Sequence, residues 1–353
     1  MRGAVQSGDM KSRIASDDPL ATPDFFPMAI KPQRNTLVFA SMTRESLVQS
    51  PCLDRWYTVF ASSTMLMAEI PKLLSRGPQR PLHFILHNAF CGSTLLARHL
   101  EGLPHCLVLK EPQVLGQIAI LKNRELVPSE PDRWADWFEV VFAMLARGYP
   151  SDREVVVKAS STCNTLGNAL LDHDKNTKIV FLYSGLRTFL LQVLKSKDRR
   201  QWLRKHMEDV LAGQMAQVPF LTGTRAADLT DGQRASTMWL VNSFLCRSLL
   251  TRSDANRILL LDGEDLISRP TEVVLAAANF LGLIIDDADR TVLNDIRPIV
   301  HHAKDAALPY DAETRAAELA GAEERHGGEV QAAMAWAETV SGGWLAESPF
   351  PVA

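Results

Sequence analysis

PLHFILHNAFCGSTLLARHLEGLPHCLVLKEP, residues Pro81 to Pro112, is the stretch that decides the fold. Its pattern predicts a buried strand at Phe84–Leu86, a tight loop over His87–Ser93, a helix that begins near Thr94 and a second strand at Cys106–Leu109. A strand that leads through a loop of small residues into a helix can hold a phosphate, because the loop amides and the first helical turn point at one anion. We therefore predict a phosphate-handling loop here.

The loop has the residues for this task but not a standard nucleotide-binding pattern. Gly92 allows close approach of the backbone to a ligand, and Ser93 and Thr94 add hydroxyl donors. The Walker A pattern G-x-x-x-x-G-K-[ST] is not met, since His87 replaces its first Gly and Ser93 replaces its Lys. This argues against an ordinary ATPase or GTPase. A plain strand-to-helix turn, in which Gly, Ser and Thr are also common, is the alternative that the loop alone leaves open.

The composition is that of an ordinary globular protein. The 353 residues are 46% hydrophobic and 22% charged, with a formal net charge of −3, which gives no reason to expect a nucleic-acid partner. The five cysteines are scattered and odd in number, which fits a reducing compartment. No apolar run approaches the length of a membrane span, and the N-terminus has no secretory signal. His301 and His302 have no third ligand at metal-site spacing, so we expect no metal. From the cysteines and the absence of a signal or an apolar span, we expect a cytoplasmic location.

Four parts are predicted along the chain. Residues 1–35 are polar and punctuated by proline, which is typical of a mobile tail. Residues 36–80 are predicted to be a helical segment, because the apolar positions from Thr43 to about Leu74 suit one or two helices. Residues 81–305 are predicted to form an α/β domain, and residues 306–353 a helical C-terminal segment.

Short apolar strands alternate with helices in the predicted domain, which indicates an α/β fold with a mostly parallel sheet. Further strands are predicted at Glu154–Lys158, Lys178–Tyr183 and Arg257–Leu261, and helices at 112–122, 131–147, 159–171, 186–195, 198–213, 231–253, 270–281 and 311–340. Ligands bind such sheets at the carboxyl ends of the strands. Four segments follow strands and should therefore gather along one edge: His87–Thr94, Lys110–Glu111, Lys158–Ser160 and Ser184–Arg187.

These residues, in this order, resemble the P-loop sulfotransferase family, with a divergent bacterial member as the nearest type. Ala89–Leu96 is similar to the family's 5′-phosphosulfate loop, and Arg257–Gly282 looks like its late strand, acidic turn and helix. His301–Ala317 looks like C-terminal segments of bacterial members. The resemblance covers roughly Pro81 to Gly282 and implies a three-layer P-loop NTPase-like fold, with a central mostly parallel sheet flanked by helices. It also implies 3′-phosphoadenosine-5′-phosphosulfate (PAPS) as cofactor and sulfuryl transfer to a hydroxyl or amine.

The resemblance also implies which residues bind the cofactor. The 5′-phosphosulfate loop falls on Cys91, Gly92, Ser93, Thr94 and Leu95. The family's 3′-phosphate site falls on Ser184, with Arg187 on a neighbouring basic position. Several positions depart from the family. Its loop carries Lys or Arg where this chain has Phe90, its 3′-phosphate Arg and the Ser eight residues further fall on Ser184 and Gln192, and the base that cytosolic members place after Lys158 is absent from Ala159-Ser160.

Glu111 and Lys158 are the candidate catalytic residues. Glu111 lies where tyrosylprotein-type members carry a general base, so the resemblance implies that it takes a proton from the acceptor. Its alternative is a structural ion pair with Lys110 or with a helix end. Lys158 ends a strand and could neutralise charge in the transition state, or could simply reach solvent. Lys304 could supply the cation missing at Phe90 if the C-terminal segment folds back over the loop.

Three functions remain open from the sequence. The first is a sulfotransferase-like enzyme that uses PAPS and an unidentified small-molecule or peptide acceptor. The second is a catalytically weak or inactive nucleotide- or phosphate-binding protein on the same fold. The third is an atypical phosphotransferase, against which the absent Walker Lys weighs.

Overall fold

A five-stranded parallel sheet lies at the centre of the computed structural model, which describes residues 20, 22–54, 62–74, 79–125, 133–285, 301–302, 305–309 and 312–351. The strand order is β5-β6-β4-β7-β8, and every neighbouring pair is parallel. The strands are β4 (Leu82–His87), β5 (Cys106–Lys110), β6 (Glu154–Lys158), β7 (Ile179–Tyr183) and β8 (Ile258–Asp262). All five coincide closely with the strands predicted from the sequence.

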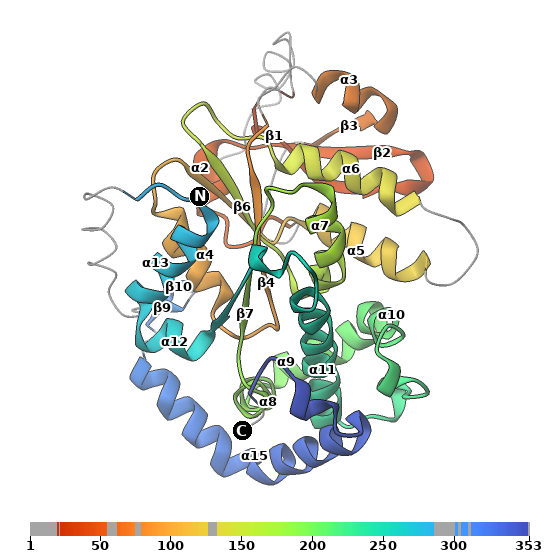
Figure 1. Cartoon of the computed structure of the whole chain (residues 1–353), viewed down its shortest axis with the longest axis vertical. Coiled ribbons are helices and arrows are strands. Elements are labelled where there is room, and N and C mark those ends of the chain that lie inside the picture. The colour runs from red at the N-terminus through yellow and green to blue at the C-terminus, as the bar shows by residue number, and fades with distance from the viewer. Residues whose placement is uncertain are drawn as a thin grey trace.

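Each inner strand is buried on both faces. Along β4, Phe84 and Leu86 belong to one core cluster and Ile85 to the other, since successive side chains point to opposite faces. The smaller cluster packs under α4 and α13, and the larger one under α5, α6, α8 and α11. Figure 1 shows these helices on the two sides of the sheet. The predicted three-layer P-loop NTPase-like α/β fold is thus confirmed.

The helices fill the connections between strands and extend beyond the last one. Their bounds are α2 (Arg44–Gln49), α3 (Ile70–Leu74), α4 (Ser93–Glu101), α5 (Gln113–Glu125), α6 (Arg133–Leu145), α7 (Gly167–His173), α8 (Leu186–Leu194), α9 (Lys197–His206), α10 (Ala212–Met215), α11 (Asp231–Leu250), α12 (Gly263–Ser268), α13 (Pro270–Leu281) and α15 (Ala312–Ser341). Short turns of helix are η1 (Pro32–Arg34), η2 (Met67–Glu69), η3 (Ser161–Leu166), η4 (Met207–Leu211), η5 (Pro219–Leu221), η6 (Ala226–Asp228), η7 (Ala255–Arg257) and η8 (Trp344–Glu347).

The N-terminal part differs from the prediction. An antiparallel sheet of β1 (Phe25–Lys31), β2 (Thr36–Ser41) and β3 (Ser62–Leu66) stands where a mobile tail and a helical segment were predicted. The prediction was wrong for these strand ranges. Strand β1 holds Pro27 at a register shift between Pro27 and Ala29, where a strand tolerates a proline. Phe26, Met28 and Ile30 of β1 are buried in the larger core cluster. The boundaries between the four predicted parts stay a prediction.

The C-terminal part packs on the larger face of the core. The long helix α15 contacts α8 and α11, and its buried Val330 and Ala333 belong to the same cluster as β4 and β7. Two short strands, β9 (His301–His302) and β10 (Asp305–Pro309), precede it. In Figure 1 the carboxyl ends of the central strands point toward α8, α9 and α15, which places the expected ligand edge on that side.

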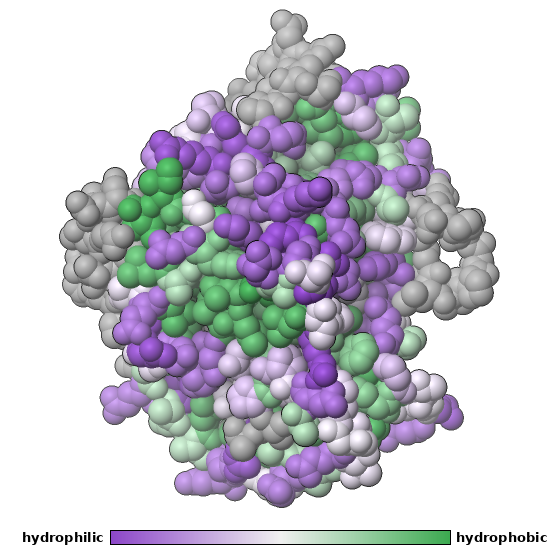
Figure 2. Space-filling view, viewed as in Figure 1, coloured by the Kyte–Doolittle hydropathy of each residue, from purple (hydrophilic) through white to green (hydrophobic). Residues whose placement is uncertain are grey.

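The outermost strand β8 is less covered than the other four. Leu259, Leu260 and Leu261 are only half-buried, and Figure 2 shows an apolar area over the part of the surface where Figure 1 draws β8. None of the described helices combines the length and the hydropathy that a membrane crossing requires.

Candidate functional site

The loop after β4 curls back on itself before α4 begins. Ala89, Phe90 and Gly92 have φ angles of 68°, 52° and 89°, all in the left-handed region. Successive backbone N–H groups in left-handed and turn conformations can make a concave row, which is a typical anion-binding shape. Ser93 is the first residue of α4, so the helix N-terminus adds its own amides and the positive end of its dipole. The geometry therefore fits the predicted phosphate-handling loop.

Two side chains at the start of the loop fix it to the neighbouring strands. The Ala89 N–H donates to Nδ1 of His87 (2.9 Å), so Nε2 carries the proton and donates to the Ala159 carbonyl after β6 (2.9 Å). Asn88 donates to the Ser184 carbonyl after β7 (2.9 Å) and accepts from the Ser184 N–H (3.2 Å). Where the Walker A pattern has its first glycine, this chain has His87, whose ring is held by hydrogen bonds at both nitrogens.

The residues predicted to bind the cofactor through the loop are largely buried. Ser93 and Thr94 are 4% and 8% exposed, and Leu95 packs its side chain into the smaller core cluster. The Cys91 thiol donates to the Leu182 carbonyl (3.3 Å). Burial raises the pKa of this thiol to about 12, while the Lys158 ammonium and backbone N–H groups of the loop oppose the rise. Cys91 is therefore a protonated donor, and it and Leu95 could reach a ligand only through their backbone.

The ends of β5 and β6 bring Glu111 and Lys158 together. Their side chains form an ion pair, and the Glu111 N–H donates to the Lys158 carbonyl (2.6 Å). The Lys158 side chain is 2% exposed and that of Glu111 is 21% exposed, so the carboxylate is the more open partner. Glu111 also has a left-handed backbone, with φ of 50°, and strained residues of this kind cluster at functional sites.

Lys110 is not the partner of Glu111. Its ammonium forms an ion pair with Glu101 of α4 and donates to the Val48 carbonyl (2.6 Å). The sequence left a Lys110–Glu111 pair open, and the structure gives each residue a different partner. The predicted convergence of the four segments at one edge is confirmed by the bonds of the loop to Ala159 and Ser184, together with the Lys158–Glu111 pair.

The predicted 3′-phosphate residues have other surroundings. Ser184 is 1% exposed, and its carbonyl accepts from Asn88 and from Trp239 Nε1 (3.0 Å). The next turn is covered by the C-terminal segment, since the Leu186 N–H at the start of α8 donates to the Pro351 carbonyl (3.0 Å). Arg187 forms an ion pair with Glu323 of α15 (2.6 Å). The roles of Ser184 and Arg187 in cofactor binding stay a prediction, and Lys304 lies outside the described residues.

Sequence reasoning did not foresee that Arg199 lies against the loop. Its guanidinium carbon is 4.8 Å from the ring centroid of Phe90, and the Trp202 ring meets Phe90 edge-on at 5.5 Å. From the sequence, the basic run of Arg199, Arg200, Arg204 and Lys205 is predicted to be a solvated helix face, with attraction of an anionic acceptor as the alternative. The only signal that could have separated Arg199 from them is its spacing, because residues 199, 202 and 206 share one side of a helix.

Comparison with known proteins places sulfotransferases among the similar structures. No protein-family model matches the chain, and no curated protein matches its sequence. A sulfotransferase from Alicyclobacillus acidocaldarius is 15% identical, with 75% of this chain and 96% of the other aligned at a TM-score of 0.39. Sulfotransferase STF1 from Mycobacterium tuberculosis is 14% identical over 72% of this chain and 80% of its own, with a TM-score of 0.41. Mouse sulfotransferase SULT7A1, solved with PAP, is 11% identical over 64% and 67%, with a TM-score of 0.31.

Such distant likenesses assign no activity to this chain.

Proposed function

We propose that the protein is a sulfotransferase-like enzyme that transfers a sulfuryl group from PAPS to a hydroxyl or amine acceptor. The observation that carries the proposal is the meeting of three parts at one sheet edge: a curled loop at a helix N-terminus, a buried Lys158 and a more open Glu111. An anion at the loop, a cation beside it and a carboxylate within the same edge are the groups that a transfer to a nucleophile needs.

The donor set of the loop fits the 5′ end of such a cofactor. Backbone N–H groups near Gly92 and the hydroxyls of Ser93 and Thr94 are neutral donors, which bind phosphate and sulfate oxygens without requiring a metal. When bound, PAPS would supply the activated sulfuryl group. The predicted 3′-phosphate residues are less available to a ligand, because Ser184 is buried and Arg187 is paired with Glu323.

The chain's own residues divide the remaining work. Glu111 would accept the proton of the acceptor hydroxyl or amine, since its carboxylate is the partly exposed member of the pair. Lys158 holds the Glu111 carboxylate in place. Its ammonium also adds positive charge near the loop, where it opposes the rise in the pKa of the Cys91 thiol. Helix α12 begins so close to the Cys91 carbonyl that Gly263 admits no side chain there, so the helix packs directly against the loop.

A non-catalytic nucleotide- or phosphate-binding protein is the second candidate. Two observations favour it: the loop has Phe90 where a cation would be expected, and the Ser184 hydroxyl is buried. Both candidates require the loop to bind an anion, and they differ only in whether a group is transferred.

A thermal-shift panel of PAPS, 3′,5′-ADP, ATP and GTP tests the proposal, because a ligand that binds only the folded state raises the melting temperature. We expect PAPS and 3′,5′-ADP to stabilise the protein most. Small hydroxyl and amine compounds are then screened with PAPS labelled in its sulfuryl group. Binding without transfer to any acceptor would favour the second candidate, and stabilisation by ATP or GTP alone would contradict the first.

A further inference from the structure

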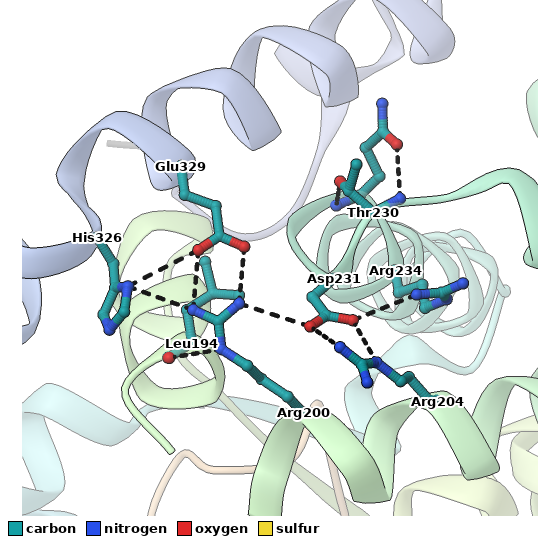
Figure 3. A network of polar contacts seen from close by, with 9 residues as sticks. Leu194, Arg200, Arg204, Thr230, Asp231, Arg234, His326 and Glu329 are labelled. Atoms are coloured by element: carbon teal, nitrogen blue, oxygen red, sulfur yellow. Dashed lines mark hydrogen bonds and ion pairs between the residues drawn. The ribbon is translucent and has the colours of Figure 1, made fainter. Parts of the chain in front are cut away.

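Helix α9 uses its basic residues in two different ways. Arg200 forms an ion pair with Glu329 of α15 (2.8 Å), and Arg204 with Asp231 of α11 (2.6 Å). In Figure 3 Arg200 points to Glu329 and Arg204 points to Asp231. Arg234 forms an ion pair with the Asp231 carboxylate as well. The side of α9 that carries Arg200 and Arg204 therefore anchors the helix to α15 and α11. Part of the predicted solvated face thus has a structural role.

The other side of α9 faces the loop. Arg199 stands with its guanidinium over the Phe90 ring, and Trp202, one turn further along, meets the same ring. Two hydrogen bonds hold Arg199 there, to the carbonyl of Gln192 (2.6 Å) and to its side-chain Oε1 (2.8 Å). Gln192 is itself 4% exposed, so the support is rigid. The ion pairs of Arg200 and Arg204 fix the helix that carries this arrangement.

The loop needs a positive charge that its own side chains do not provide. From His87 to Thr94 its side chains are neutral donors or apolar, His87 being held as a neutral imidazole by its two hydrogen bonds. Negative charge that develops on a leaving phosphate is stabilised chiefly by cations placed beside it. Lys158 is turned to Glu111 and Arg187 to Glu323, whereas Arg199 is placed directly over a loop residue.

We propose that Arg199 supplies positive charge that the loop's own side chains lack, in addition to that of Lys158, and contacts the anionic group of the donor that the loop binds. The inference rests on the proposed function, since that defines the donor as a nucleotide with a 5′-phosphosulfate. A guanidinium suits the role because its fork of donors matches phosphate and sulfate oxygens, and because it stacks on an aromatic ring while doing so. Phe90 is then the surface that positions the cation, and Arg199 is a donor-binding residue.

The experiment separates charge from packing. Arg199→Met keeps an unbranched side chain that packs on an aromatic ring but removes the charge, and Arg199→Lys keeps the charge. Isothermal titration compares PAPS with adenosine 3′-phosphate, which lacks any charged group at the 5′ position. We expect Arg199→Met to weaken PAPS binding about tenfold to a hundredfold, the usual effect of losing a charge-assisted hydrogen bond, and to leave adenosine 3′-phosphate unchanged. Arg199→Lys should retain most of the affinity for PAPS.

A second variant tests the location of the charge. Phe90→Arg, introduced into Arg199→Met, puts a guanidinium on the loop itself and should restore PAPS binding. The control is Lys197→Met, which removes a positive charge from an exposed position on the first turn of the same helix and should leave binding unchanged. Thermal melting of each variant checks that it is folded, and if Arg199→Met does not fold, the Phe90→Arg/Arg199→Met protein and Arg199→Lys decide the question.

The outcomes distinguish this inference from the proposed function. Unchanged PAPS affinity in Arg199→Met, or equal loss in the Met and Lys variants, would overturn the role of Arg199 alone. A wild-type protein that binds neither PAPS nor 3′,5′-ADP would overturn the proposed function and the role of Arg199 with it.

Discussion

Lys158 and Glu111 are joined twice, by an ion pair between their side chains and by a backbone hydrogen bond of 2.6 Å between the ends of β6 and β5. The pair is asymmetric, because the lysine is almost fully buried while the carboxylate is partly exposed. Removing the carboxylate leaves a buried positive charge without its partner, whereas removing both charges does not. A catalytic role and a structural role therefore predict different results for single and double variants.

The first prediction concerns this pair. We expect Glu111→Gln to lower turnover roughly 10²–10⁴-fold, the usual contribution of a general base, with little change in PAPS affinity. It should also lower the free energy of unfolding by about 3–5 kcal/mol, the cost of breaking a buried pair. The double variant Glu111→Gln/Lys158→Met should regain stability but not turnover. Urea midpoints and transfer of labelled sulfuryl groups measure the two effects.

The neighbouring pair Lys110–Glu101 provides the control. Lys110 is as buried as Lys158 and is also paired with a carboxylate, but it points to α4 and Val48. Glu101→Gln should therefore lower stability without a change in turnover. Full activity in Glu111→Gln would exclude Glu111 as the base and leave the pair a structural one.

The second prediction concerns the left-handed backbone of the loop. Gly92 has φ of +89°, and a Cβ there would lie 3.4 Å from the Cδ2 atom of Leu266. Gly92→Ala should lower stability by about 1–2 kcal/mol, because an L-residue is strained in this conformation. It should also weaken PAPS binding at least about tenfold, since relief of the strain moves the amides that face the anion. Isothermal titration and thermal melting measure the two effects.

Gly282 is a matched control for Gly92. It has φ of +85° at the end of α13, and a Cβ there would meet only Lys178 Nζ, at 3.9 Å. Gly282→Ala should lose similar stability and keep its affinity for PAPS. Unchanged PAPS affinity in Gly92→Ala would show that this loop does not bind the donor.

The third prediction concerns the contact between α12 and the loop. A Cβ on Gly263 would collide with the Cys91 carbonyl oxygen and lie 3.0 Å from that of Tyr183, and neither backbone atom can move freely. Gly263→Ala should destabilise the protein by about 1–3 kcal/mol, as overpacking of a core usually does. Gly328, in the middle of α15, has nothing within 4 Å of its Cβ position. Gly328→Ala should instead stabilise by about 0.5–1 kcal/mol.

Urea denaturation of the two alanine variants gives this comparison directly. Opposite signs are expected, and a Gly263→Ala protein as stable as the wild type would mean that α12 does not pack directly against the loop.

The central sheet could be predicted because its strands are buried on both faces. Runs such as Phe84–Leu86 and Ile179–Tyr183 are continuously apolar and bounded by turn residues, which leaves few alternatives to a parallel sheet. The rule that ligands bind at the carboxyl ends of such strands then located the edge where Glu111, Lys158 and the loop meet.

The N-terminal sheet gave a weaker signal. Strand β3, Ser62–Leu66, alternates between exposed and half-buried residues and has no buried face of its own. Strand β1 contains Pro27, which reads as a break in a sequence but lies at a register shift in the structure. Short edge strands of this kind depend on pairing with β2, and no local sequence pattern predicts that pairing.

The surroundings of the site depend on contacts that a local pattern does not contain. The burial of the turn after Ser184 comes from Pro351, and the ion pair of Arg187 comes from Glu323 on α15. The contact between Phe90 and Arg199 joins the loop to a helix far along the chain. The motif could therefore indicate which residues face an anion, but not which cation approaches them.

The last prediction concerns His99, on the helix that follows the loop. Burial lowers the pKa of its imidazole from 6.5 to about 4. Between these two pH values the unfolded chain binds a proton that the folded protein does not, so stability falls as the pH falls from 6.5 toward 4. The slope for one such group is roughly 1.4 kcal/mol per pH unit within that window. His99→Gln removes the titrating group and should flatten the profile.

Urea midpoints from pH 7 to pH 4 measure this effect as the difference between wild type and His99→Gln. The difference is needed because burial also raises the pKa of Glu101, on the same helix, and a carboxylate of this kind acts with the opposite sign. A His99→Gln protein that loses as much stability as the wild type between pH 6.5 and pH 4 would show that His99 is not the group responsible.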